Sequence, residues 1–381
     1  MEDFAFRNPT KIIFGKGKER LVGSELKQAG ITSVLLVYGR SSARKSGILD
    51  RVMGSLAENG VRYAEFGGVV PNPLLSHARD GIRIARKEKV EAVLAVGGGS
   101  VLDEAKAIAL GALAGSDLWN FYTGTEITGA LPVFTVLTLA ATGSEMNGNS
   151  VITNEITKEK FSVSSPHLYP RVSILNPELT FSVSPAYTAY SAVDAIAHVI
   201  EGYFTGARNT RLQDRLVESI VATVIESTEA ILAAPRDYQA RAELEWAATL
   251  ALNGIASAGI GPFSFPNHMI EHSLSALYDI AHGAGLAIVI PAWMKWYKDK
   301  NEEKLARFGR AIFNVEGADA GIAALEAWFR KIGAPVRLAE AAIPASDIKA
   351  IAVNALRLSQ RWRMQETYTQ ETIAEILRLA V

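Results

Sequence analysis

Four of the six histidines in this chain fall into two short stretches whose spacing could build one metal site. Asp194 and His198 stand four residues apart, as do His268 and His272, and His282 follows soon after. On a helix, residues at this spacing project from the same face one turn apart, so each pair could present two ligand atoms together. The pattern predicts one chelate made by Asp194, His198, His268 and His282.

The donor types indicate which metal such a site would take. One oxygen and several nitrogen ligands suit Zn²⁺ or Fe²⁺, whereas Ca²⁺ and Mg²⁺ prefer shells made mostly of oxygen. Asp194 stands among alanines, isoleucines and valines, where a charged group needs a partner to offset its desolvation. His77 and His167 lie in polar stretches and are expected to be packed or surface residues rather than ligands.

Local signals predict the helices that would carry these ligands. Ser184-Pro185 offers an N-cap and a first-turn proline for a helix that should end near Gly202. Pro266-Asn267 marks the start of a second helix, which would carry His268 and His272. His282 precedes a Gly-Ala-Gly run and is expected at a turn.

Composition favours a globular enzyme and excludes several other classes. The chain has 381 residues, 49% of them hydrophobic, and is therefore long enough for two domains. Its net charge of −1 does not suggest the basic patch that binding to a nucleic acid requires. No apolar run reaches the roughly 18 residues of a membrane span, and the first residues lack signal-peptide character, so a cytoplasmic location is expected. The absence of cysteine removes disulfides and thiolate ligands.

The two halves of the chain differ in their hydropathy patterns. In the first half, apolar strands alternate with amphipathic helices, which predicts a Rossmann-like parallel sheet covered on both faces. The second half shows successive long helical patterns. We therefore expect an α/β dinucleotide-binding domain over 1–182 and an all-helical metal-binding domain over 183–381, with the metal in the cleft. The predicted strands are 34–38, 61–66, 90–96 and 131–137, and the predicted helices are 48–59, 75–88, 187–200, 212–232 and 241–257.

A glycine-rich turn follows the predicted strand 90–96. Gly97, Gly98 and Gly99 would let the backbone approach a ligand closely, and Ser100 could cap a helix whose free amides bind phosphate. This is not the GxGxxG pattern, and the same arrangement also occurs as a plain structural turn. A second polar turn, 138–145, follows the strand 131–137, and two such turns at strand ends form the crevice where open parallel sheets hold nucleotides.

Across nearly its whole length the sequence resembles the iron-dependent (group III) alcohol dehydrogenases. The matching segments are 8–17, the Pro71-Asn72-Pro73 turn, 97–106, 141–145, 194–201 and 268–285. Within that family, the run 138–144 and the stretch 193–200 look most like the butanol dehydrogenase and aldehyde reductase branch. The segment 361–365 departs from the family pattern.

The resemblance implies specific roles. It places the metal ligands at Asp194, His198, His268 and His282, and an unligated histidine beside the metal and the nicotinamide at His272. Such a histidine is the candidate proton shuttle, or it only hydrogen-bonds one of the metal ligands. It also implies that the cofactor is bound by a set of glycines, hydroxyls and polar side chains from the first domain. These are Asn72, Gly97, Gly98, Gly99, Ser100, Asp103, Thr138, Thr142 and Lys160.

One departure bears on the choice of cofactor. Family members that prefer NAD place an aspartate after the first core strand, where this chain has Gly39. Arg40, Ser41 and Ser42 follow and supply a guanidinium and hydroxyls suited to a 2′-phosphate, and Arg44-Lys45 adds positive charge. We therefore expect NADP(H) to be preferred over NAD(H).

The resulting hypothesis is an enzyme, a homodimer, that transfers hydride between NADP(H) and a primary alcohol or aldehyde such as butanol or butanal, with Fe²⁺ or Zn²⁺ as a Lewis acid. No nucleic-acid or membrane partner is expected. A glycerol-dehydrogenase-like polyol dehydrogenase using NAD is an alternative. A zinc peptidase is another, because residues 268–272 read H-x-x-E-H. A nucleotide-binding regulatory protein would leave the dense ligand set unexplained.

Overall fold

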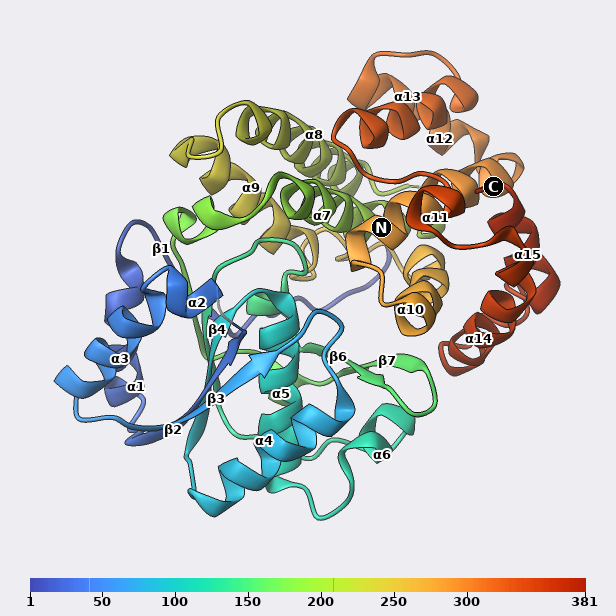
Figure 1. The fold of residues 1–381 in the computed structure, drawn as a ribbon. Helices are drawn as coiled ribbons and strands as arrows, with labels where there is room; N and C mark the ends of the chain where they lie inside the picture. Colours follow the sequence, from blue (N-terminus) through green and yellow to red (C-terminus); the bar gives the residue numbers. More distant parts are fainter. Residues whose placement is uncertain (41, 208) are drawn as a thin grey trace. The chain divides into compact units, whose positions relative to one another are not determined.

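The computed structural model describes residues 1–40, 42–207 and 209–381 (Figure 1). Its contacts group the chain into two units. The sheet unit comprises Arg7–Val183 and Arg236–Thr249, and the helical unit comprises Met1–Phe6, Ser184–Pro235 and Leu250–Val381. The predicted fold class, a parallel-sheet domain followed by a helical domain, is confirmed. The domain limits of 1–182 and 183–381 stay a prediction.

The sheet unit is built on six parallel strands in the order β1-β8-β5-β4-β2-β3. The central strands β2, β4 and β5 are apolar and almost wholly buried, as expected where helices cover both faces. The strands are β1 Lys11–Phe14, β2 Ser33–Gly39, β3 Arg62–Val69, β4 Ala92–Gly97, β5 Val133–Leu137 and β8 Val172–Leu175. An antiparallel hairpin joins β6 (Asn149–Asn154) to β7 (Glu159–Ser164). The sequence patterns predict β2 to β5 but not β1, β8 or the hairpin.

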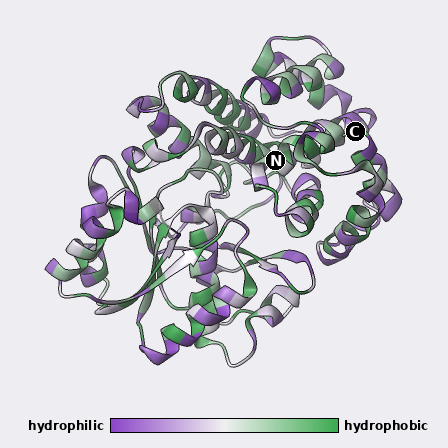
Figure 2. Cartoon of the chain, in the orientation of Figure 1, coloured by the Kyte–Doolittle hydropathy of each residue, from purple (hydrophilic) through white to green (hydrophobic). Residues whose placement is uncertain are grey.

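Helices cover both faces of this sheet. On one face Leu26 and Val52 pack in a core with Val34 and Leu36, while α5 packs along β4 on the other. In Figure 2, α3 and α4 alternate between hydrophobic and hydrophilic colours, as expected for helices that bury one side. The helices are α1 Val22–Gln28, α2 Ser42–Lys45, α3 Ile48–Glu58, α4 Leu75–Lys87, α5 Gly99–Leu113, α6 Leu118–Thr123 and α9 Tyr238–Ala251, the last belonging to this unit up to Thr249.

The strand order reverses between β2 and β4. From β2 the chain moves outward to β3, then returns to place β4 on the other side of β2. In open parallel sheets, ligands bind outside the carboxyl ends of the strands at such a switch point. Here those ends are Gly39 and Gly97, so the two segments that follow them are where a ligand is expected to bind.

The helical unit consists of packed helices, and its first helix begins as predicted. The Ser184 side chain accepts a hydrogen bond from the Tyr187 amide at 3.3 Å. The helix continues three residues past the predicted end near Gly202, to Thr205. A Cβ on Gly202 would lie 2.9 Å from Ile260 Cδ1, so this glycine allows close packing rather than ending the helix. The helices are α7 Pro185–Thr205, α8 Arg211–Ala233, α10 Pro266–Tyr278, α11 His282–Tyr297, α12 Glu302–Phe308, α13 Ala318–Lys331, α14 Ile348–Arg361 and α15 Gln370–Arg378.

The expected turn at His282 is wrong, because His282 is the first residue of α11. The glycines after it serve close helix packing instead. A Cβ on Gly283 would lie 2.0 Å from the Tyr190 carbonyl oxygen on α7, and one on Gly285 would lie 2.8 Å from Glu271 on α10. None of the helices in the described part of the chain combines the length and the hydropathy needed to cross a membrane.

Candidate metal centre and dinucleotide site

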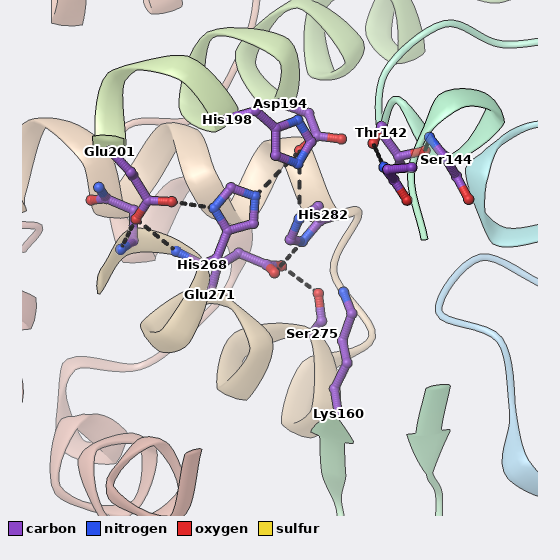
Figure 3. Close-up of polar contacts among 12 residues, drawn as sticks. Thr142, Ser144, Lys160, Asp194, His198, Glu201, His268, Glu271, Ser275 and His282 are labelled. Atoms are coloured by element: carbon purple, nitrogen blue, oxygen red, sulfur yellow. Dashed lines mark hydrogen bonds and ion pairs between the residues drawn. The ribbon is translucent and has the colours of Figure 1, made fainter. Parts of the chain in front are cut away.

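Three helices of the helical unit bring the predicted metal ligands together (Figure 3). Asp194 and His198 come from α7, His268 from α10 and His282 from the start of α11. Asp194 Oδ1 lies 3.5 Å from His198 Nε2, 3.7 Å from His268 Nε2 and 3.5 Å from His282 Nε2. The ligand atoms of Asp194, His268 and His282 all lie within 4.8 Å of one another, while the His198 ring stacks on His268.

These spacings fit a metal better than a set of hydrogen bonds. In a tetrahedral site with bonds of about 2.1 Å, neighbouring ligand atoms stand about 3.4 Å apart. Among the described residues, Asp194 Oδ1 and His268 Nε2 are buried without a hydrogen-bond partner, an arrangement that is costly unless something else satisfies them. The observed nitrogen and oxygen donors therefore suit Zn²⁺ or Fe²⁺.

Two buried glutamates orient the imidazoles from behind. Glu201 Oε2 bonds His268 Nδ1, and Glu271 Oε2 bonds His282 Nδ1. Each contact directs the Nε2 of its histidine toward Asp194, the carboxylate–histidine arrangement that fixes the ring and raises its basicity at metal sites. Neither residue appears in the predicted site, although both stand three residues after a histidine on a buried helix face.

The electrostatics of the cluster reflect its burial. Burial lowers the pKa of His198 to about 3. Burial alone would raise the pKa of Asp194, but His198 and His282 outweigh it and hold that pKa below its usual value. Burial likewise opposes a charge on His268, yet Glu201 and Asp194 raise its pKa to about 10.

His272 lies beside this cluster rather than in it. Its ring centroid is 5.6 Å from that of His282 and 6.5 Å from that of His268, and the residue is 4% exposed. Atoms of Glu271, His272 and His282 also come within 4.8 Å of one another. Both oxygens of Glu271 bond within the protein, to His282 and Ser275, so this glutamate does not stand free as the base of an H-x-x-E-H peptidase.

In the sheet unit, the glycine turn is tightly packed. A Cβ on Gly97 would lie 2.5 Å from Val101, and one on Gly99 would lie 2.3 Å from Thr142 Oγ1. The prediction that Ser100 caps α5 is wrong, because the helix begins at Gly99 and its N-cap is Gly98, which has no side chain. The first amides of α5 therefore have no side-chain cap, an arrangement suited to a pyrophosphate.

A buried polar network holds the second polar turn, residues 138–145, beside the glycine turn. Lys106 Nζ donates to Ser144 Oγ at 2.8 Å, and Ser144 Oγ donates to Asp103 Oδ1 at 2.6 Å. Burial lowers the pKa of Lys106 to about 8 and raises that of Asp103. Asp103 Oδ2 also accepts from the Val151 amide at 3.1 Å, so this predicted cofactor residue bonds the protein through both oxygens.

The other predicted cofactor residues of this unit lie at strand ends and in the hairpin. The Thr138 amide donates to the Gly97 carbonyl at 3.0 Å, which joins the two turns. Lys160 on β7 is buried and donates to Asn72 Oδ1 at 2.9 Å. Asn72 itself has a left-handed backbone, with a φ of 53°.

The segment after β2 contains the residues expected to set the cofactor preference. At Gly39 a Cβ would meet only ordinary contacts, at 3.8 Å from Val69 and 3.9 Å from Val101, so a side chain has room there. Arg40 is exposed. Ser41 lies outside the described residues, and Ser42 begins α2. Arg44 donates to Tyr38 Oη at 2.7 Å and pairs with Glu65, so its charge is partly neutralised.

Comparison with known proteins gives consistent matches. A family model described as "Iron-containing alcohol dehydrogenase" matches residues 9–177, and one described as "Fe-containing alcohol dehydrogenase family, C-terminal" matches residues 188–381. The chain is 42% identical over 365 residues to a probable NADH-dependent butanol dehydrogenase 1 of Bacillus subtilis, covering 93% of this chain and 94% of that protein. It is 37% identical over 361 residues to the NADPH-dependent aldehyde reductase YqhD of Escherichia coli, with 92% of each covered.

A solved structure shows the same fold. The crystal structure of an NADH-dependent butanol dehydrogenase A from Thermotoga maritima superposes with a TM-score of 0.97 at 48% identity, over 100% of this chain and 99% of that one.

Proposed function

Because the chain belongs to the iron-containing alcohol dehydrogenase family and is thus a nicotinamide-dependent alcohol oxidoreductase, we propose that it interconverts short primary alcohols and aldehydes such as butanol and butanal with NADP(H). The observation that carries the proposal is the convergence of three imidazole nitrogens on Asp194 Oδ1 at 3.5 to 3.7 Å. Such a donor set serves no packing purpose, and it matches the needs of a divalent metal.

We propose Asp194, His198, His268 and His282 as the ligands of Fe²⁺ or Zn²⁺. When bound, the metal would supply a Lewis acid that polarises an aldehyde carbonyl or stabilises an alkoxide. Glu201 and Glu271 hold the rings of His268 and His282 in orientation, so the donors need little rearrangement to act together.

The remaining steps fall to other side chains. His272 is the candidate to exchange a proton with the substrate oxygen, because its imidazole lies beside the proposed ligands without belonging to them. In the sheet unit, the uncapped amides at the start of α5 would bind the pyrophosphate, and Thr138, Thr142, Asn72 and Lys160 would position the cofactor. The cofactor carries the hydride, and the protein fixes its geometry.

The preference for NADP(H) rests on the segment after β2. Gly39 offers no carboxylate that would repel a 2′-phosphate or accept from both ribose hydroxyls. Arg40 is exposed and follows directly. Relatives named for NADH and for NADPH both match the chain, so the family alone does not decide. We propose Gly39, Arg40, Ser41 and Ser42 as the phosphate site.

The experiment compares kcat/KM for NADPH and NADH with butanal in the wild type and in Gly39→Asp. Charge-assisted hydrogen bonds should favour NADPH by roughly tenfold to a hundredfold, and the added carboxylate should reverse the preference. Gly115→Asp is the matched control, since that glycine also has open space and lies just past the opposite end of α5. Equal use of both cofactors by the wild type would refute the preference, while no oxidation of either would refute the reductase itself.

We also propose that the enzyme is a homodimer, because symmetric dimers are the commonest assembly of such chains. Light scattering of the purified protein gives the mass directly. A mass near the chain's own 41.0 kDa would contradict the proposal.

A further inference from the structure

One aromatic ring of the helical unit covers His272. The indole of Trp362 packs edge-on against that imidazole, with ring centroids 5.7 Å apart and planes at 67°. Trp362 is the C-cap that directly follows Arg361, the last residue of α14, and its amide donates to the Leu358 carbonyl at 2.9 Å. The next residue, Arg363, has a φ of 57°, so the chain turns sharply away just after the indole.

The indole is therefore one ring removed from the metal cluster. His272 contacts Trp362 on one side, and its centroid lies 5.6 Å from that of His282, a proposed ligand. Helices α10 and α14 pack against each other, which fixes the two rings. Trp362 is only partly buried, whereas His272 is 4% exposed. A bulky, rigid and uncharged side chain thus borders the proposed proton shuttle without belonging to the ligand set.

We propose that Trp362 is a specificity-determining residue whose indole forms a wall of the substrate pocket and limits the length of the aldehyde chain. The inference rests on the proposed function. A substrate oxygen that reaches both the metal and His272 must lie beside that imidazole, and its carbon chain must leave through space that the protein does not fill. The indole occupies space next to His272, so a longer or branched substrate that extends past this imidazole on that side would meet it.

The test measures kcat/KM for butanal and for octanal in the wild type and in Trp362→Ala. Removing the wall should raise the octanal-to-butanal ratio by at least about tenfold, the scale at which apolar pockets discriminate. Trp362→Leu should give a smaller rise, and Trp362→Phe, which keeps a flat ring, should stay near the wild type. A ratio in Trp362→Ala within about twofold of the wild type would overturn the proposal.

Trp296→Ala is the matched control. Trp296 is also a partly buried tryptophan of the helical unit, but it lies fourteen residues along α11 from His282, about 21 Å at the helical rise. Its loss should leave the chain-length ratio unchanged. If Trp362→Ala does not fold, Trp362→Leu decides by the same ratio, with metal content and melting temperature measured for every variant.

A binding measurement without turnover separates this proposal from the proposed function. Ligand-observed NMR gives the affinities of butan-1-ol and octan-1-ol for the metal-loaded protein without nucleotide. Trp362→Ala should tighten octan-1-ol binding relative to butan-1-ol by a similar factor, and an unchanged relative affinity would overturn the wall. A wild type that reduces neither aldehyde would refute the reductase, while the alcohol affinities would still judge Trp362.

Discussion

Buried glutamates of the two units differ in whether their carboxyl oxygens have hydrogen-bond partners. In the helical unit, Glu201 and Glu271 bond the Nδ1 atoms of His268 and His282. In the sheet unit, Glu145 and Glu245 are 1% and 0% exposed, and of their four oxygens only Glu145 Oε1 is bonded, by Thr249 Oγ1 at 2.6 Å. Burial raises the pKa of Glu245 well above its usual value, and the nearby Glu145 raises it further.

The difference shows that burial of an acid does not by itself mark a site. At the metal cluster the unsatisfied atoms are nitrogen and oxygen donors that converge on one point, an arrangement that a cation completes. At the Glu145 and Glu245 carboxyls the unsatisfied atoms are all acceptors, which protons neutralise. Convergence of unlike donors, rather than burial, identifies the centre.

The largest effect in this comparison is expected when the Asp194 carboxylate, on which the three imidazoles converge, is removed. Asp194→Ala should lower kcat/KM for butanal by at least about a thousandfold and reduce the bound metal, because one change removes a ligand and the Lewis acidity it supports. Metal content by plasma mass spectrometry accompanies the kinetics. Glu245→Gln is the control and should keep both. Full activity and metal in Asp194→Ala would remove this carboxylate from the ligand set.

A second test weakens the support behind the ligands. Glu271→Gln keeps the shape of the side chain but loses the charge that orients His282, so metal affinity should fall by about tenfold to a hundredfold. Competition with a chromophoric chelator measures that affinity. Glu145→Gln is the matched change in the sheet unit, where no effect on metal is expected. Equal affinities in the two variants would leave Glu271 a structural residue only.

A third test concerns Glu245, whose two carboxyl oxygens have no hydrogen-bond partner among the residues that the structure describes. Glu245→Met should raise the free energy of unfolding by about 2 kcal/mol at pH 8, since it removes a buried carboxyl without partners. Glu245 has a raised pKa in the folded state, so its penalty is absent below the ordinary glutamate pKa of about 4.5 and grows as pH rises toward the folded pKa. Urea unfolding at pH 4.5 and pH 8 measures the difference. A gain that is equal at both pH values would show that Glu245 is not neutral in the fold.

The smallest effect is expected at Glu104, a buried glutamate with one bonded and one unbonded carboxyl oxygen. Glu104, 0% exposed, bonds His77 Nδ1 at 2.5 Å, while its other oxygen has no partner. The bond to Glu104 raises the pKa of His77, burial opposes it, and the Gly67 carbonyl and Asp80 add to the rise. The stabilisation is therefore complete below about pH 6.5 and is lost as pH rises through the folded pKa.

His77→Gln should accordingly lower the free energy of unfolding more at pH 6 than at pH 9, by less than about 1 kcal/mol after solvent screening. Arg83→Gln, on the exposed face of the same helix, is the control. A loss that does not depend on pH would show that the contact is only a packing one.

Spacing within single helices made much of the site predictable. Asp194 with His198, and Pro266 with the following histidines, follow local rules, and the structure places these residues on α7 and α10 as expected. Glu201 could not be assigned in this way, because its partner His268 lies on another helix and their contact depends on how α7 and α10 pack. The hairpin β6–β7 could not be predicted for a different, local reason, since its strands are short and carry many polar residues and its turn places Lys158 at a φ of 55°.

The close approach of α11 to α7 at Gly283 has a consequence for anyone who reads function from mutational tolerance. No atom of this glycine can serve as a ligand through a side chain, yet even an alanine would drive its Cβ into the Tyr190 carbonyl, 2.0 Å away. A saturation library selected for activity would therefore rank Gly283 with the histidines. At Gly283 such a library would report the distance between two helices, and a metal assay on the inactive variants that still fold would tell the two kinds of intolerance apart.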